Sequence, residues 1–204
     1  MIDESAPSVR IRQYRPSDRA AVHDICIRTA DAGEDATASY DDPNVLPNLF
    51  AHPYTYLDPD LAFVADDNGR AVGYVLGASD TARFAQRFRT EWLPLVGDQY
   101  PAPPGTPNTP DEVMAHLLHT PERMVQPALA AYPAHLHIDL LPDYQRSGHG
   151  RELIAAFLQA LGDVPLHIGM VTANHRARPF YDRLGFHEIP HPDPGPLTYL
   201  GRTP

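Results

Sequence analysis

The chain has 204 residues, 43% of them hydrophobic, and a formal net charge of −10 at pH 7. This length and hydrophobic fraction predict one folded domain over residues 1–204 and exclude an intrinsically disordered chain. The negative charge disfavours a nucleic-acid-binding protein, which needs a basic surface, and suits cationic partners such as amines.

The first half of the chain predicts a strand and a helix, followed by a β-hairpin. Asn68-Gly69 favours a tight turn between two strands, and Gly73 within the second strand is consistent with a bulge or a close approach of another backbone. The expected elements are a strand at 9–14, a helix at 17–31, a short helix near 45–51 and hairpin strands at 61–65 and 71–78.

A helical, proline-rich insertion is expected at about residues 81–131. A helix runs to about residue 95, a loop rich in proline follows, and shorter helices complete the segment. No second core can be read from it, so we assign it to the same domain. The remaining expected elements are a strand at 134–141, a strand at 165–172 between two helices, and final strands at 186–189 and 197–200.

Cys26 is the only cysteine, so no intrachain disulfide can form. It shares a helical apolar stripe with Val22 and Ile25, which predicts core packing rather than a nucleophile. A single thiol fits a reducing cytoplasm. No apolar run approaches the ~20 residues of a membrane span, and no signal-peptide pattern opens the chain. We therefore expect a cytoplasmic protein without a membrane segment.

The stretch Gln145-Arg146-Ser147-Gly148-His149-Gly150 lies between a predicted strand and an apolar helix. A glycine-containing turn at a helix start presents unpaired backbone N–H groups and a positive dipole end, which suit a phosphate or pyrophosphate. The stretch lacks the Lys-Ser/Thr of a P-loop and the third glycine of a dinucleotide fingerprint. It therefore predicts a different phosphate-binding turn.

A second motif spans residues 174–186. Asn174 is a good N-cap, and Gly185 supplies the left-handed residue that follows a helix. The apolar stripe consists of Ala177, Phe180, Tyr181 and Leu184. Pro179, at about the fifth position of the predicted helix, is expected to bend it because proline lacks a backbone donor.

These two motifs, Q/R-x-x-G-x-G/A and N-x-x-A-x-x-x-Y-x-x-x-G-F, resemble the acyl-CoA site of the GNAT family of N-acetyltransferases. The resemblance implies an α/β fold with a twisted, mostly antiparallel central sheet that opens between its fourth and fifth strands, and helices on both faces. A narrower likeness, in residues 31–35, 53–64 and 73–77, is to bacterial relatives of the acetyltransferase-like C-terminal domain of eukaryotic O-GlcNAc hydrolase.

The resemblance also implies roles for individual residues. Backbone N–H groups of residues 146–151 would hold the pyrophosphate of acetyl-CoA, and main-chain groups of Leu140 and Leu141 would pair with its pantetheine arm. Tyr181 would donate a proton to the departing CoA thiolate. The predicted acetyl-CoA-binding residues are Leu140, Leu141, Gln145, Arg146, Ser147, Gly148, His149, Gly150, Arg151 and Asn174.

Direct attack on a thioester needs a neutral amine, so the site needs a proton acceptor. Asp139, on the strand that leads into the turn, is the first candidate, although strand alternation places it with His135 and His137 on a face that could point away from the acceptor. The alternative is the acidic loop of Asp31, Glu34 and Asp35, which could select a cation or relay a proton through water.

No metal site is predicted, because His135 with His137 and His116 with His119 share faces but lack a third ligand. The predicted function is acetyl transfer from acetyl-CoA to a small-molecule amine or a peptide or protein lysine, in a ternary complex. The alternatives left open are a non-catalytic acyl-CoA sensor or interaction domain, and a binding module without CoA. Pairing into a homodimer is also left open.

Overall fold

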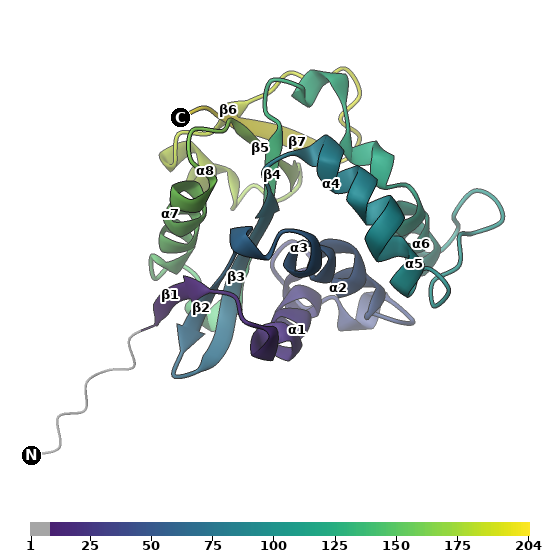
Figure 1. Cartoon of the computed structure of the whole chain (residues 1–204), viewed down its shortest axis with the longest axis horizontal. Helices are drawn as coiled ribbons and strands as arrows, with labels where there is room; N and C mark the ends of the chain where they lie inside the picture. Colours follow the sequence, from purple (N-terminus) through teal and green to yellow (C-terminus); the bar gives the residue numbers. More distant parts are fainter. Residues whose placement is uncertain (1–8) are drawn as a thin grey trace, which may run out of the picture.

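The computed structural model describes residues 9–204, so the first eight residues of the predicted domain lie outside it. A seven-stranded sheet with the order β1-β2-β3-β4-β5-β7-β6 runs through the molecule, with β1–β3 at one end and β5–β7 at the other (Figure 1). Its strands are β1 (Arg10–Gln13), β2 (Ala62–Asp67), β3 (Arg70–Ala78), β4 (Ala134–Leu140), β5 (Leu166–Val171), β6 (His187–Glu188) and β7 (Leu197–Arg202).

All neighbouring strands are antiparallel except β4 and β5, which run parallel. This parallel pair is joined at only two positions, Ala134 with Leu166 and His135 with His167. Beyond His135 the two strands separate, whereas β4 remains paired with β3 as far as Leu140. The predicted α/β fold with a sheet that opens between its fourth and fifth strands is therefore confirmed.

The hairpin of β2 and β3 is formed as the sequence predicted. Asn68 and Gly69 both adopt positive φ angles, of 51° and 92°, as a tight two-residue turn requires. The register shifts by one residue between Ala65 and Asp66, opposite Gly73. A Cβ atom at Gly73 would lie 2.7 Å from Cγ of Leu140, so this glycine allows β4 to approach closely.

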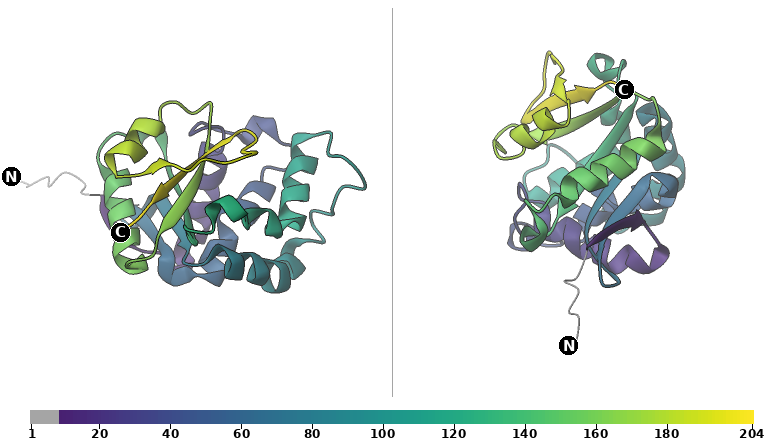
Figure 2. Two further views of the ribbon diagram at one scale, coloured as in Figure 1. Left: turned by 90° about the horizontal axis from the view of Figure 1, so that it is seen from above. Right: turned by 90° about the vertical axis from the view of Figure 1, so that its left-hand side faces the viewer.

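Helices cover both faces of the sheet (Figure 2). On one face α7 (His149–Leu161) buries Leu153, Ile154 and Phe157, and the Phe157 ring packs on Gly77 of β3. On the opposite face lies α1 (Arg19–Thr29), whose buried side includes Val22, Ile25 and Cys26. The short helices α2 (Val45–Phe50) and α3 (His52–Leu57) lie beside α1 and complete this layer.

The segment predicted to be an insertion contains several short helices and turns. Its elements are α4 (Thr81–Arg87), a π-helical turn (Phe88–Trp92), α5 (Leu93–Val96), α6 (Pro110–His119) and 3₁₀ turns at Pro121–Met124 and Pro127–Leu129. Phe84, Phe88 and Trp92 belong to the same buried cluster as the sheet residues. Helix α8 (Arg178–Arg183) lies between β5 and β6 in the C-terminal part of the chain. Among residues 9–204, no helix has the length and apolar character needed to cross a bilayer.

Candidate active site

The turn between β4 and α7 has the backbone geometry of an anion cradle. Gly148 caps the helix with φ of 92°, and Arg146 is also left-handed, with φ of 61°. The backbone N–H groups of residues 146–150 donate to no acceptor within the described part of the chain, whereas those of Arg151 and Glu152 turn back to the carbonyl of Gly148. Unpaired N–H groups at a helix start form a site for a phosphate.

The side chains of the cradle leave its centre open. The Gln145 side-chain amide donates to the carbonyl of Leu140 at 2.9 Å, which ties the turn to the end of β4. A Cβ atom at Gly148 would meet nothing within 4 Å, so the space above this residue is empty. Arg146 and Arg151 are exposed and form no ion pair within residues 9–204. Both cations can therefore serve a bound phosphate.

His149 and Ser147 contribute less to the cradle. The Ser147 hydroxyl donates to the carbonyl of Gln145 at 3.3 Å. Nδ1 of His149 lies 3.6 Å from a carboxylate oxygen of Glu152, and this buried atom has no hydrogen-bond partner. Gly150 packs tightly on α8, because a Cβ atom there would lie 3.3 Å from the Phe180 ring. Gly150 thus joins two helices besides belonging to the turn.

The opening between β4 and β5 exposes the main chain of β4. The N–H of Ala134 donates to the carbonyl of Pro165, just before β5, and the N–H of Leu141 donates to the carbonyl of Val72 in β3. Because backbone groups alternate in direction along a strand, Ile138 and Leu140 present theirs to the opening. The N–H of Leu141 is bonded to Val72 and its carbonyl accepts from Tyr144, so its pairing with the pantetheine arm stays a prediction.

Asp139 faces the layer of α1, on the opposite side of the sheet from α7. Its carboxylate accepts a hydrogen bond from the hydroxyl of Tyr74, which lies directly across the strand pair, at 2.7 Å. Burial raises the pKa of Asp139 to about 6, against the opposing effect of the Tyr74 hydrogen bond. A carboxylate with a pKa near neutrality can take up and release protons at physiological pH.

Cys26 lies in the same region but is inert. Only 4% of the residue is exposed, which agrees with the predicted core position. Burial, and then the negative charge of Asp139, raise the pKa of the Cys26 thiol. A thiol held protonated in this way is a poor nucleophile.

Tyr181 lies on α8 at the other side of the opening. Its ring packs on Phe180 and Phe186, with centroids 5.1 and 5.5 Å apart, and its hydroxyl has no hydrogen-bond partner in the structure. Burial raises the pKa of Tyr181, and the charge of Asp139 raises it further. The phenol of Tyr181 therefore stays protonated at neutral pH.

The helix that carries Tyr181 is shorter than predicted. It begins at Arg178 with Ala177 as its N-cap, so Asn174 does not cap it. Pro179 consequently falls in the first helical turn, where the missing N–H costs nothing, and the predicted bend is absent. The Asn174 side chain forms no hydrogen bond within residues 9–204, and this amide is available to a ligand.

The acidic loop lies next to the cradle. Asp31 and Glu34 form a backbone bridge, and a Cβ atom at Gly33 would lie 3.8 Å from the side-chain amide of Gln145. A Glu34 carboxylate oxygen is 4.0 Å from Arg176. Hydrogen bonds from Thr37 lower the pKa of the exposed Asp35, so this carboxylate is not suited to accept a proton near neutral pH.

Two features of the site were not identified from the sequence. Tyr74 anchors Asp139, and alternation within its strand gave no sign of that partner. His135 and His137 share the hydroxyl of Tyr54, at 2.9 and 3.0 Å, in a buried hydrogen-bonded chain. In the portion of the chain that the structure covers, no group of three or more His, Cys, Asp or Glu side chains could hold a metal ion.

Comparisons with known proteins agree with this geometry. A family model described as the acetyltransferase (GNAT) domain matches residues 130–193, which contain β4, the cradle and α8. The crystal structure of SsHAT is 59% identical in sequence, has a TM-score of 0.93, and the match covers 97% of this chain and 98% of that one.

Two more distant matches are also informative. The PaiA N-acetyltransferase of Thermoplasma acidophilum, solved in complex with coenzyme A, has the same fold at 12% identity, with a TM-score of 0.55 over 97% of this chain and 99% of that one. Protein O-GlcNAcase of Rattus norvegicus is 24% identical over 200 residues, which are 95% of this chain and 22% of the relative. The chain thus spans about a fifth of the length of the curated relatives it matches.

Proposed function

The chain belongs to the GNAT family of acetyltransferases, and we propose that it transfers an acetyl group from acetyl-CoA to an amine acceptor. One observation carries the proposal. The unpaired N–H groups of the cradle follow directly on β4, whose main chain is exposed where β4 and β5 separate. A candidate site for a phosphate beside a free strand edge supports the binding of acetyl-CoA, and Asp139 and Tyr181 are the candidates for the base and the acid.

Acetyl-CoA would supply the activated acetyl thioester. The N–H groups of residues 146–150 would bind its pyrophosphate, and Arg146 and Arg151 would add positive charge. Main-chain groups of Ile138 and Leu140 would pair with the pantetheine amides in the manner of an added strand. The Asn174 amide, which has no partner in the structure, would bind the arm from the side of β5.

Asp139 would act as the general base. An amine with a pKa near 10 is protonated at pH 7 and cannot attack a carbonyl carbon until it loses a proton. With its pKa raised to about 6, the Asp139 carboxyl is mostly ionised at pH 7 and still basic enough to take that proton. The amine nitrogen then forms the new C–N bond as the C–S bond breaks.

Tyr181 would act as the general acid. Its hydroxyl is protonated, because burial raises its pKa, and it has no competing hydrogen bond. It would donate its proton to the CoA sulfur as the C–S bond breaks, and Asp139 would hold the proton taken from the amine. The nitrogen of the new C–N bond would then give its second proton to the Tyr181 phenolate, which leaves a neutral amide. Asp139 would release its proton to solvent, so the proton count balances over the cycle.

The proposed chemistry of the site identifies the acceptor only as an amine. A small-molecule amine and a lysine of a peptide or protein both meet this requirement. The chain itself contains no lysine, so the protein offers no lysine acceptor of its own. An assay of transferred acetyl groups is therefore free of background from self-acetylation at lysine.

The test measures CoA thiol release from acetyl-CoA with a panel of amines, alongside calorimetry with CoA. Cys26 is buried and should add little thiol background. We expect saturable CoA binding and amine-dependent thiol release that falls in Tyr181→Phe but not in the control Tyr132→Phe, whose hydroxyl bonds to His187 elsewhere. Binding without release from any amine would replace this proposal with a non-catalytic acyl-CoA-binding function. No CoA binding would refute both.

A further inference from the structure

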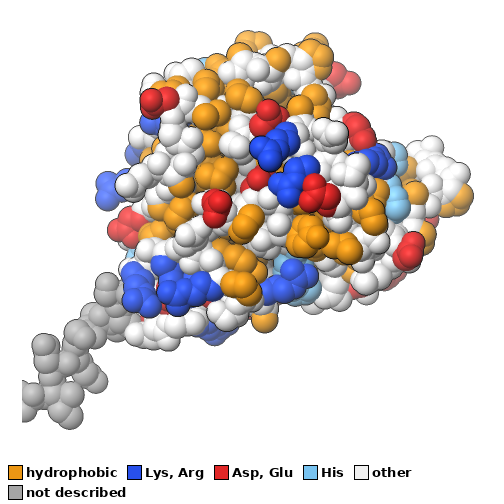
Figure 3. Space-filling view, viewed as in Figure 1, with side chains coloured by type: hydrophobic (Ala, Val, Ile, Leu, Met, Phe, Trp, Pro, Cys, Tyr) orange, Lys and Arg blue, Asp and Glu red, His pale blue; other side chains and the backbone are white. Residues whose placement is uncertain are grey.

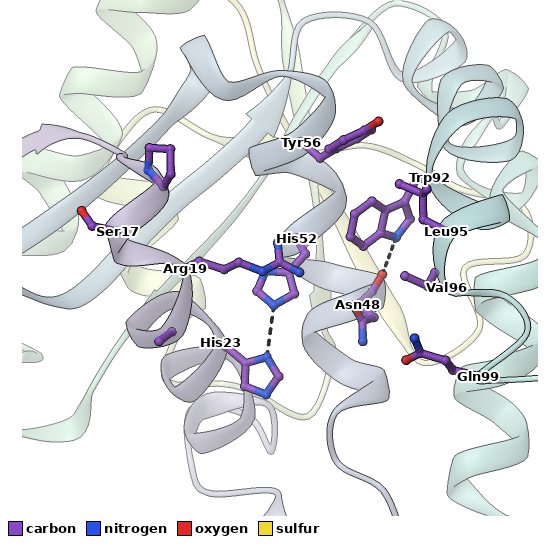
Figure 4. Close-up of a pocket in the computed structure, with 12 residues that line it drawn as sticks. Ser17, Arg19, His23, Asn48, His52, Tyr56, Trp92, Leu95, Val96 and Gln99 are labelled. Atoms are coloured by element: carbon purple, nitrogen blue, oxygen red, sulfur yellow. Dashed lines mark hydrogen bonds between the residues drawn. The ribbon is translucent and has the colours of Figure 1, made fainter.

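A second concave site lies away from the active site. A cavity of about 900 Å³ opens between the first half of α1, the junction of α2 and α3, and α5 (Figure 4). Its lining includes none of the residues of the cradle and neither Asp139 nor Tyr181. A volume of this size is in the range that accommodates a small organic ligand.

The charge in this cavity is positive, in contrast to the protein as a whole. Arg19 is the one charged residue of the lining, and no Asp or Glu from residues 9–204 takes part in it, although the chain has 26 acidic residues. Arg19 is exposed and forms no ion pair with the described residues. Its neighbour Asp18 is buried and bonded to Arg12, so that carboxylate is not available to neutralise Arg19.

Two hydrogen-bonded histidines lie beside Arg19. Nε2 of His23 is 2.9 Å from Oδ1 of Asn44, and Nδ1 of His23 is 3.1 Å from Nε2 of His52. Burial, and then the charges of Arg19 and His23, lower the pKa of His52 to about 3. Both ring nitrogens of His23 are engaged in hydrogen bonds, and Arg19 is the one arginine in the lining.

The wall opposite Arg19 is apolar and aromatic. Tyr56 and Leu95 are 51% and 55% exposed, which is unusual for side chains of their size, and both line this cavity. The ring of Trp92 lies behind Tyr56, with centroids 5.5 Å apart, and is held by a hydrogen bond from its Nε1 to the carbonyl of Asn48. Figure 4 shows Arg19 extending from α1 towards His52, with Trp92, Leu95 and Val96 across the cavity.

We propose that this cavity binds a small organic carboxylate with a flat apolar body. The planar guanidinium of Arg19 matches the geometry of a carboxylate, and a single positive charge suits a single negative one. The apolar body covers Tyr56 and Leu95, whose exposure to water is then relieved. The outer surface on this side of the molecule mixes acidic, basic and apolar side chains (Figure 3), so the acid-free lining of the cavity provides the selectivity for an anion.

The test uses Trp92, the only tryptophan in the chain, whose indole N–H gives one assignable signal in an ¹⁵N–¹H correlation spectrum. The probe is 3-phenylpropanoate, with the uncharged 3-phenylpropanamide as the matched compound. We expect a saturable shift of the indole signal with the carboxylate and binding of the amide that is weaker by about tenfold or more, since hydrogen bonds to charged groups are worth that much.

Two variants within the cavity, with a third outside it as the control, locate the site. Arg19→Gln should weaken carboxylate binding about tenfold, whereas Arg83→Gln, at an exposed arginine of α4 outside the cavity, should leave it unchanged. Ala20→Phe fills the cavity from α1 without changing its charge and should abolish the shift. Three results would each overturn the proposal. They are equal binding of the carboxylate and the amide, equal effects of the two arginine variants, and the absence of a saturable shift in the wild type. None of these readouts depends on acetyl transfer.

Discussion

Replacement of Asp139 by asparagine should make the protein more stable at alkaline pH and much less active. Asparagine has nearly the same shape, and its side-chain oxygen can accept the hydrogen bond from Tyr74 that the carboxylate accepts at 2.7 Å. The substitution removes the ionisable group and leaves the packing with α1 in place. Stability and activity are therefore expected to change in opposite directions.

The size of the stability effect follows from the pKa. Burial raises the pKa of Asp139 from 3.8 to about 6, so the folded protein holds this proton more tightly than the unfolded chain does. At about 1.4 kcal/mol per pH unit of difference, the ionised carboxylate costs the folded state about 3 kcal/mol. Below pH 4 both states are protonated and the cost is absent. It grows as the pH rises from about 4 to 6 and is complete above about pH 7.

Urea denaturation of the wild type and Asp139→Asn at pH 4.5 and pH 8 measures this effect. At pH 8 we expect the free energy of unfolding of the asparagine variant to exceed that of the wild type by roughly 1–3 kcal/mol. At pH 4.5 the difference should be much smaller. Asp143→Asn, at an exposed aspartate three residues after the strand, is the control and should show no such change. Equal stability of variant and wild type at pH 8 would refute the reasoning, because the carboxylate would then carry no burial cost.

The remaining predictions concern the rate, the cradle and the core. Asp139→Asn should lower the transfer rate by 10²–10⁴-fold, roughly, and remove the rise of activity through about pH 6 that the wild type should show; a retained rise would exclude Asp139 as the base. Tyr181→Phe should lower kcat about 10–100-fold with acetyl-CoA affinity nearly unchanged, as steady-state kinetics and calorimetry can test. Gly148→Ala should abolish acetyl-CoA binding, as measured by calorimetry. It should also lower the free energy of unfolding in urea by about 1–2 kcal/mol, because φ at this position is 92°. Phe157→Ala should cost about 3–5 kcal/mol of unfolding free energy, since the ring is fully buried against Gly77.

The sequence predicted those parts of the site that depend on local chemistry. The turn at residues 145–150 combines a strand end, two glycines and a helix start within a few residues, and no distant contact is needed to form it. The same holds for the hairpin at Asn68-Gly69 and for Gly185, whose φ of 82° ends α8. In each case the residue that fixes the backbone lies inside the element it shapes.

The start of α8 was mispredicted because two local signals compete there. Asn174 is a favourable N-cap, and a helix that began there would place Pro179 in its interior at a cost of about 3 kcal/mol. Starting at Arg178 places the proline in the first turn and avoids that cost. The steric demand of proline is larger than the gain from a cap, which is about 1 kcal/mol, and it determines where the helix starts.

The backbone hydrogen bonds of Leu141 and the contact of Tyr74 with Asp139 were not predicted from the sequence, for a different reason. Alternation along a strand shows which side chains share a face, but not which backbone groups face which neighbouring strand. That depends on register, and the one-residue shift between Ala65 and Asp66 shows that register here includes a bulge. Likewise, Tyr74 lies opposite Asp139 only because β3 and β4, more than 50 residues apart in the chain, pair in that register.

The choice between catalysis and acyl-CoA binding alone rests on what a carboxylate at position 139 contributes. A protein that only binds acyl-CoA gains nothing from a buried charge there, since asparagine would keep the Tyr74 hydrogen bond and avoid a cost of about 3 kcal/mol. A general base, in contrast, needs the raised pKa that this burial produces. The same physical effect that destabilises the folded state gives Asp139 the proton affinity that a base would need. The presence of the aspartate therefore favours a transferase.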